Sequence, residues 1–197
     1  MSKAVMISIR PKWCEMIVNG KKTVEVRKTR PRLEPPFKCY IYCTKPRYPF
    51  EDFISYETED GTVGFYGGGK VIGEFICEGI VRLYYEQFDD AKDENDGFYQ
   101  WWDSTPNWAR TLDTKSCLTS NDFHDYLGTK GGYAWHISNL IIYDQPRKIG
   151  EFRRICHNDL YCESCAMYHT HNGNCGNYSL QVQRQPQSWC YVEELEG

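Results

Sequence analysis

The sequence predicts an α+β fold that is mainly β, with short helices and a small C-terminal extension. Short segments that alternate apolar and polar residues recur along the chain, which is the pattern of half-buried strands. Helical periodicity with start and stop signals is limited to short stretches. After Pro146 the composition changes, because cysteines accumulate. Together these observations favour one mainly β domain that carries an appendage.

Length and composition set the expected organisation. A chain of 197 residues, 41% hydrophobic and 15% aromatic, is large enough to bury a core. We predict a domain over residues 1–148 and a tail over residues 149–197. The apolar stretch at residues 4–9 is too short for a signal peptide, and no segment approaches the ~18 apolar residues of a membrane span. We therefore expect a cytoplasmic protein with no membrane partner.

The charge is unevenly distributed. A net charge of -4 argues against a protein that coats nucleic acid over its whole surface. Residues 10–38 nevertheless hold nine Lys or Arg against three Asp or Glu, whereas residues 86–96 hold six acids and one lysine. We expect a basic side that includes the N-terminal segment.

The N-terminal segment indicates a strand, a short helix and a second strand. Residues 4–9 alternate in the manner of a strand. Pro11 suits the first turn of a helix, and Gly20 suits the position just past its end. The apolar face of this helix is predicted to consist of Trp13, Met16 and Ile17. The following strand begins near Val24.

A cluster of ionic residues lies on that second strand. Because successive side chains point to opposite faces, Val24 and Val26 should enter a core while Thr23, Glu25 and Arg27 share the other side. Lys22 stands at the entrance of the strand and is close enough to join them. We interpret Lys22, Glu25 and Arg27 as a candidate catalytic or ligand site. A charged strand face exposed to water is the alternative.

The rest of the domain continues the pattern. Further strands are predicted at residues 38–44, 70–77, 79–85 and 133–143, and a helix at residues 120–127. The glycine run before Lys70 indicates a hairpin turn, because Val71 follows the lysine where a phosphate-binding loop needs Ser or Thr. Tryptophans within residues 101–108 would cover the core as a lid or stack on bases.

The tail has the composition of a small metal-binding extension. Two of its cysteines form a C-x2-C pair, a spacing that lets two thiolates bind one ion. In a reducing compartment such cysteines are thiols or metal ligands. We predict a structural zinc ion, with an iron–sulfur cluster and unliganded thiols as alternatives. The candidate ligands are Cys156, Cys162, Cys165, Cys175 and Cys190.

The signature G-x-K-x-x-E-x-R at Gly20, Lys22, Glu25 and Arg27 resembles that of the ASCH family, a branch of the PUA-like β-barrels. The preceding run from Ser8 to Trp13 fits the same family, and residues 133–137 are similar to the strand that closes such barrels. The resemblance covers roughly residues 3–148. It implies a PUA-like barrel whose cleft receives RNA or a modified nucleoside.

Under the binding interpretation, basic residues hold phosphates and aromatic or polar neighbours contact a base. Besides the ionic cluster, the candidate ligand-binding residues are Arg10, Lys12, Thr23, Tyr133 and His136. A purely structural role, with the tail as a docking surface, is a further alternative that no residue specifically favours.

Under the enzymatic interpretation, the resemblance implies a hydrolase that acts on a modified nucleoside or on RNA. It extends to ASCH amidohydrolases that act on N4-acetylcytidine, and other relatives are linked to RNA cleavage. The signature of the amidohydrolases reads G-x-K-T-x-T-x-R, and Lys22, Thr23 and Arg27 match it, whereas Glu25 replaces the nucleophilic threonine. An acyl-threonine route is therefore closed at position 25. A carboxylate there can still act as a general base for water, with a nearby cation stabilising an oxyanion. Asp122 is considered for the family's separate catalytic carboxylate.

Overall fold

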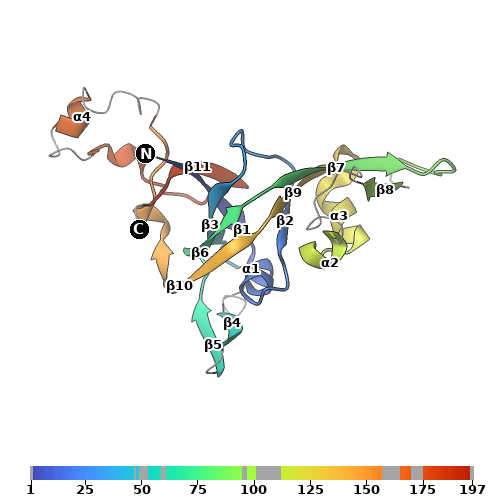
Figure 1. Ribbon diagram of the computed structural model, residues 1–197, viewed down its shortest axis with the longest axis horizontal. Helices are drawn as coiled ribbons and strands as arrows, with labels where there is room; N and C mark the ends of the chain where they lie inside the picture. The colour runs from blue at the N-terminus through green and yellow to red at the C-terminus, as the bar shows by residue number, and fades with distance from the viewer. Residues whose placement is uncertain are drawn as a thin grey trace.

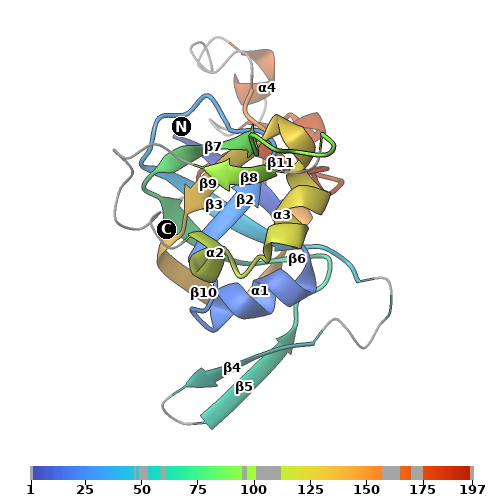
Figure 2. The same cartoon turned by 90° about the vertical axis from the view of Figure 1, so that its right-hand side faces the viewer.

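The structure is a computed structural model that describes residues 2–46, 48, 53–58, 61–94, 97–100, 112–156, 165–169 and 175–195. Two main sheets form its body, and a separate two-stranded ribbon projects from it (Figures 1 and 2). Four α-helices and three short 3-10 turns lie among the described residues.

The larger sheet has five strands. In spatial order they are β10 (Ser138–Lys148), β6 (Lys70–Cys77), β3 (Phe37–Cys43), β1 (Lys3–Ile9) and β11 (Trp189–Glu193). β1 runs parallel to β3 and antiparallel to β11, so the first and last described strands are neighbours. A parallel pair needs a crossover connection. Here the helix α1 (Pro11–Val18) and the strand β2 (Val24–Arg27) lie in that connection.

The second sheet has four strands in the order β2, β9 (Gly132–His136), β7 (Ile80–Gln87) and β8 (Gly97–Gln100). Its paired strands are antiparallel. The ribbon consists of β4 (Phe53–Thr58) and β5 (Gly61–Tyr66) and contacts α1. The described ladders therefore form separate sheets, and the closed PUA-like barrel stays a prediction.

Three apolar clusters hold these layers together. The largest lies between the two main sheets, includes Trp135 and also takes in Cys14 and Ile17 of α1. A second cluster covers the opposite face of the five-stranded sheet with residues of the C-terminal region, such as Phe152. On the outer face of the four-stranded sheet, the third cluster packs the valines of β2 against α2 (Leu112–Ser116) and α3 (Ser120–Leu127).

The local signals read from the sequence are confirmed where they were strongest. Pro11 is the first residue of α1, and Gly20 follows its end with a φ of +67°. α3 covers the predicted residues, and Thr119 and Asp122 form a reciprocal capping box at its start. β1, β3, β6 and β7 occupy the predicted segments to within a few residues.

Several predictions about connectivity are wrong. Residues 133–143 are two strands, because the chain leaves one sheet at Ile137, whose N–H donates to the carbonyl of Thr23, and enters the other. The glycine turn before Lys70 joins β5 to β6, which do not pair with each other, so it is not a hairpin. The ribbon, β8 and β11 were not predicted. The tryptophans of residues 101–108 lie outside the described residues.

The C-terminal region is joined to the rest of the chain by its own strand and side chains. β11 completes one edge of the five-stranded sheet, and Phe152 and Val182 are buried against that sheet. The short elements in this region are η4 (Ile149–Glu151), α4 (Ala166–His169) and η6 (Tyr178–Leu180). The boundary near residue 148 stays a prediction. In the part of the chain that is described, no helix has the length and apolar character needed to cross a membrane.

Candidate functional site

The candidate site is built on β2, whose two faces are both covered by other parts of the molecule. Val24 and Val26 point into the cluster beneath α2 and α3, as predicted. Glu25 and Arg27 point to the opposite face, and they are 7% and 6% exposed. Their face is the one that looks toward the five-stranded sheet, because Glu25 is paired in register with the core residue Trp135. The ionic side chains are therefore inside the molecule, which the alternative of a solvated strand face did not predict.

Glu25 lies between two cations, Lys22 and Arg27. Its Oε1 is 3.1 Å from Nε of Arg27, and its Oε2 is 3.4 Å from Nζ of Lys22. Lys22 is only 2% exposed. Buried charges are tolerated when each has an opposite charge or a hydrogen-bond partner. We call Lys22, Glu25 and Arg27 the ionic cluster.

Main-chain carbonyls complete the coordination of both cations. Nζ of Lys22 donates to the carbonyl of Ser116 over 2.6 Å, and Nη2 of Arg27 donates to the carbonyl of Ser8 over 2.6 Å. The ammonium of Lys22 also lies 5.2 Å from the ring centre of Trp13. The two cations are thus fixed by segments far apart in the sequence, while Nε of Arg27 and Oε2 of Glu25 are buried in ion pairs that do not have hydrogen-bond geometry.

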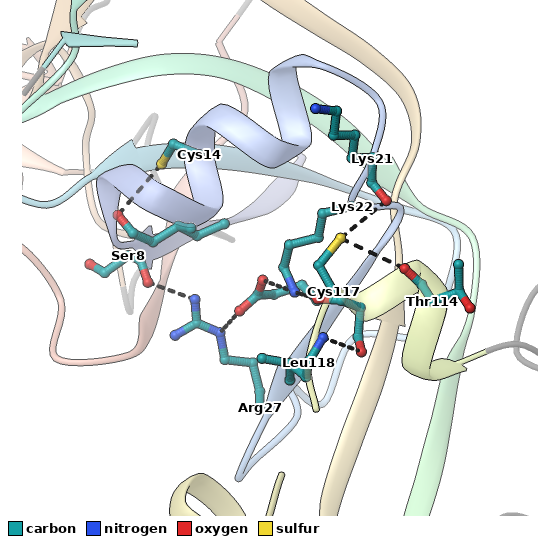
Figure 3. Close-up of polar contacts among 11 residues, drawn as sticks. Ser8, Cys14, Lys21, Lys22, Arg27, Thr114, Cys117 and Leu118 are labelled. Carbon is teal, nitrogen blue, oxygen red and sulfur yellow. Dashed lines mark hydrogen bonds and ion pairs between the residues drawn. The ribbon is translucent and has the colours of Figure 1, made fainter. Parts of the chain in front are cut away.

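The turn that presents Ser116 to Lys22 is unusual. Cys117 has a φ of +56°, a region that residues with a side chain seldom adopt. Its thiol contacts the carbonyls of Lys21, at 3.3 Å, and Thr114, at 3.7 Å (Figure 3). The N–H of Leu118 donates to the hydroxyl of Ser116. This turn connects α2 to α3 and holds the Ser116 carbonyl against the ionic cluster.

The ionic cluster lines an open cavity of about 620 Å³. Its walls come from the end of β1, α1, β2, α3 and a segment that precedes β11. The lining residues are Ser8, Ile9, Arg10, Trp13, Lys22, Glu25, Val26, Arg27, Thr44, Lys45, Leu118, Asp122, Asp125, Tyr126, Gln185, Pro186, Gln187 and Ser188. We call this cavity the cleft. A volume of this size is in the range of small-molecule sites.

The C-terminal region supplies one wall of the cleft. Ser8 donates from its hydroxyl to the carbonyl of Pro186 over 2.7 Å, and its N–H donates to the carbonyl of Ser188. Nη1 of Arg27 lies 3.5 Å from the hydroxyl of Ser188. The segment from Gln185 to Ser188 is therefore attached to the ionic cluster itself.

The structure separates the predicted ligand-binding residues into two groups. Arg10 lines the cleft. Lys12 lies over the ring of Trp13 at 4.6 Å and is not among the lining residues. The other predicted residues outside the lining are Thr23, Tyr133 and His136. Thr23 precedes β2, and its main chain bonds to Lys115 and Ile137.

His136 lies near a different set of groups. Its Nδ1 is 3.5 Å from a carboxylate oxygen of Glu78. Loss of hydration on burial lowers the pKa of His136, with Glu78 acting in the opposite direction and Lys115 in the same one. The imidazole therefore favours its neutral form at this position, away from the cleft.

Sequence reasoning missed several residues that line the cleft. Trp13 was read as part of a helix face and of the run that resembles the family, but not as a cleft residue, and Lys45 and Ser188 were not considered. Asp122 lines the cleft and accepts hydrogen bonds from the hydroxyl and N–H of Thr119 at 2.7 and 2.9 Å. These bonds lower the pKa of Asp122. Ser188, a polar residue two positions after Pro186, gives no sequence signal of its own.

The predicted metal ligands are only partly described. Cys162 lies outside the described residues, and the remaining four are unpaired thiols. Cys190 is on β11 and packs against the cluster that contains Phe152. The carbonyl of Cys175 accepts a hydrogen bond from Arg153. No group of three or more metal-ligating side chains occurs within the described ranges.

Comparison with known proteins gives one family and a few distant structures. The model of the ASCH domain family matches residues 7–115. A crystal structure of ASCH from Zymomonas mobilis is 20% identical, with 97% of this chain and 88% of that chain covered and a TM-score of 0.45. A single-substitution variant of that protein gives 18% identity, coverages of 98% and 92%, and a TM-score of 0.46. No curated protein matches the chain.

Proposed function

Since this chain belongs to the ASCH domain family, we propose that it binds RNA or a nucleoside in the cleft around Lys22, Glu25 and Arg27. Membership of the family supports a role of the RNA-binding or hydrolase-like kind in general terms. The observation that carries the proposal is the convergence of three ionic side chains on one open cavity beside the indole of Trp13. Aromatic rings and fixed polar groups are the features that receive a base.

Within the cleft the three ionic residues take different roles. Lys22 is almost fully buried and already bound to Ser116, so it positions the carboxylate of Glu25 instead of contacting a phosphate. Glu25 offers a carboxylate edge that can accept an N–H from a base. Arg27 has one long contact, to Ser188 at 3.5 Å, that a ligand oxygen can replace.

We assign the contacts with phosphate to exposed residues at the rim of the cleft. Arg10 and Lys45 are exposed and line the cleft. Asp122 and Asp125 line it as well, so the cleft is lined by both cations and carboxylates. A mixed rim of this kind favours a nucleoside or a single nucleotide unit over a polyphosphate, which would meet the two aspartates.

The binding test compares two glutamates. Calorimetry with cytidine and with a short single-stranded RNA should show at least tenfold weaker binding for Glu25→Gln. Glu34→Gln is the matched control, because Glu34 also pairs with an arginine, at 3.4 Å, but its side chain is 86% exposed. Equal affinities for the two variants, in folded protein, would contradict the proposal.

Hydrolysis is the second candidate function. A carboxylate with a cation on either side, in a cavity, can take a proton from water while a cation stabilises the oxyanion that forms. Incubation with N4-acetylcytidine should then release acetate, and Glu25→Gln should abolish turnover. If the acetylated nucleoside binds but no acetate is released, the proposed hydrolysis is contradicted and only the binding role is supported.

We further propose a structural zinc ion in the tail and a cytoplasmic location. The nine described cysteines are all unpaired, which fits a reducing compartment. Thiolates with a C-x2-C pair among them suit Zn²⁺. Elemental analysis of the purified full chain should find about one zinc per chain, and chelation should lower its melting temperature. Metal-free protein whose tail thiols all react freely would end this proposal.

A further inference from the structure

A second surface adjoins the cleft on the four-stranded sheet. Arg27 of β2 is paired in register with Tyr133 of β9, and Tyr133 is paired in register with Arg82 of β7. Residues that pair in register point to the same face, so these three side chains form one row across three strands. Neighbouring strands are ~4.8 Å apart, which places Arg82 about 10 Å from Arg27 along the row. Arg27 lines the cleft, and the row leads out of it.

The outer end of the row is a stack of a cation and two aromatic rings. The guanidinium of Arg82 lies 4.6 Å from the ring centre of Tyr133 and 5.6 Å from that of Tyr84. Its Nη2 donates to the carbonyl of Lys130 over 3.1 Å, which fixes its orientation. Tyr84 is 41% exposed, and Lys130 is exposed as well. We call Arg82, Tyr84, Lys130 and Tyr133 the flanking surface.

This combination has a chemical meaning. An arginine held over aromatic rings still presents N–H groups at its edge, and an exposed tyrosine ring such as that of Tyr84 can accept a stacked base without regard to sequence. The flanking surface carries two cations, and the carboxylate of Glu86, which follows Tyr84 on the same face of β7, accepts a hydrogen bond from the side chain of Gln100. Its charge is therefore complementary to a phosphate backbone.

We propose that the flanking surface binds the nucleotides next to the one in the cleft, so that the ligand is a single-stranded RNA and not a free nucleoside. This inference rests on the proposed function of the cleft. The row through Tyr133 connects the cleft with the flanking surface, because it begins at the cleft residue Arg27 and ends at Arg82. It also gives Tyr133 a role outside the cleft.

The test compares two lengths of RNA by fluorescence anisotropy. One is a labelled trinucleotide, and the other is a labelled strand of about twelve nucleotides, within the usual range of single-strand sites. In the wild type the longer strand should bind more tightly. Arg82→Ala should weaken its binding about tenfold and reduce the salt slope by about one. Trinucleotide binding should stay within about twofold, because the cleft is intact.

The chain contains a matched control. Arg147 lies 5.4 Å from the ring centre of Tyr143 on β10, in the other main sheet, so Arg147→Ala removes the same charge and a similar cation–aromatic pair. It should leave both affinities unchanged. Tyr84→Ala tests the surface independently, should Arg82→Ala fold poorly, and is expected to weaken the longer strand about fivefold or more.

The outcomes separate the two proposals. If the trinucleotide binds but neither Arg82→Ala nor Tyr84→Ala affects the longer strand more than Arg147→Ala does, the flanking surface is not an RNA site. If the two lengths bind the wild type equally, the inference fails in the same way while the cleft proposal stands. If no RNA or nucleoside binds the wild type, the cleft proposal fails and the flanking surface fails with it.

Discussion

The guanidinium of Arg27 donates to the main-chain carbonyl of Ser8 over 2.6 Å. Arg27 belongs to the four-stranded sheet, and Ser8 belongs to the five-stranded sheet, so this single bond joins the two layers at the cleft. The same guanidinium pairs with Glu25. One residue therefore contributes both to the assembly of the fold and to the composition of the site.

Replacing Arg27 by Met should destabilise the protein strongly. The change removes one partner of a buried ion pair and leaves the Ser8 carbonyl without its donor, a loss of about 3–5 kcal/mol in the free energy of unfolding. Urea denaturation measures it. Arg30→Met is the control, since its pair with Glu34 is largely exposed and should contribute less than about 1 kcal/mol. Comparable losses in the two variants would show that burial of Arg27 is energetically unimportant.

The positive φ of Cys117 predicts different effects for two substitutions. Cys117→Gly relieves an unfavourable backbone conformation and should keep the free energy of unfolding within about 1 kcal/mol of the wild type. Cys117→Val adds a branched side chain at the same φ and should cost about 1–3 kcal/mol. Ligand binding should weaken for Val but not for Gly, because the turn holds the Ser116 carbonyl at Lys22. Thermal unfolding and calorimetry together check this, and an equally stable Val variant would refute it.

The capping box of α3 predicts a dependence on pH. Hydrogen bonds from Thr119 lower the pKa of Asp122 in the folded state. The contribution of ionised Asp122 to the free energy of unfolding is therefore fully present above the unfolded pKa of about 3.9, and it is lost as the pH falls through the folded pKa. Asp122→Ala should lower the free energy of unfolding by about 1 kcal/mol at pH 7. The difference from the wild type should shrink below about pH 4. Melting temperatures of the wild type and of Asp122→Ala should be measured from pH 7 to pH 3. A difference between the two proteins that stays constant over this range would contradict the prediction.

A chain that ends at Lys148 should not fold. It would lack β11, which borders β1, and the buried side chains of Phe152 and Val182. It would also lack the cleft wall that contains Ser188. Circular dichroism and a urea titration of residues 1–148 should therefore show no cooperative unfolding. A cooperative transition would instead support an independent domain with its boundary near residue 148.

Much of the local structure could be predicted, because its causes lie in short stretches of sequence. Proline at the start of α1, the capping residues of α3 and the alternation of β3 each act within a few residues. Alternation also placed Glu25 and Arg27 on one side of β2. It could not show that this side faces the other sheet, since that depends on the pairing of strands far apart in the sequence.

The rest of the site depends on contacts over long sequence separations. Ser116 reaches Lys22 across 94 positions, and Pro186 reaches Ser8 across 178. Both contacts use main-chain carbonyls, which every residue has, so no side-chain type signals them. The break at Ile137 between β9 and β10 was missed for a related reason. Both strands contain apolar residues, and they differ only in the strands with which they pair, which lie in different sheets.

The adjacency of β1 and β11 constrains how this protein is made. β1 is synthesised about 190 residues before its outer partner β11, a delay of roughly 10 to 40 s at ~5–20 residues per second. Until then the apolar strand Lys3–Ile9 has an open edge that can pair with other nascent chains. Cells should therefore need chaperone protection of this N-terminal segment during translation, and newly made chains should acquire a working cleft only after the last strand has been synthesised.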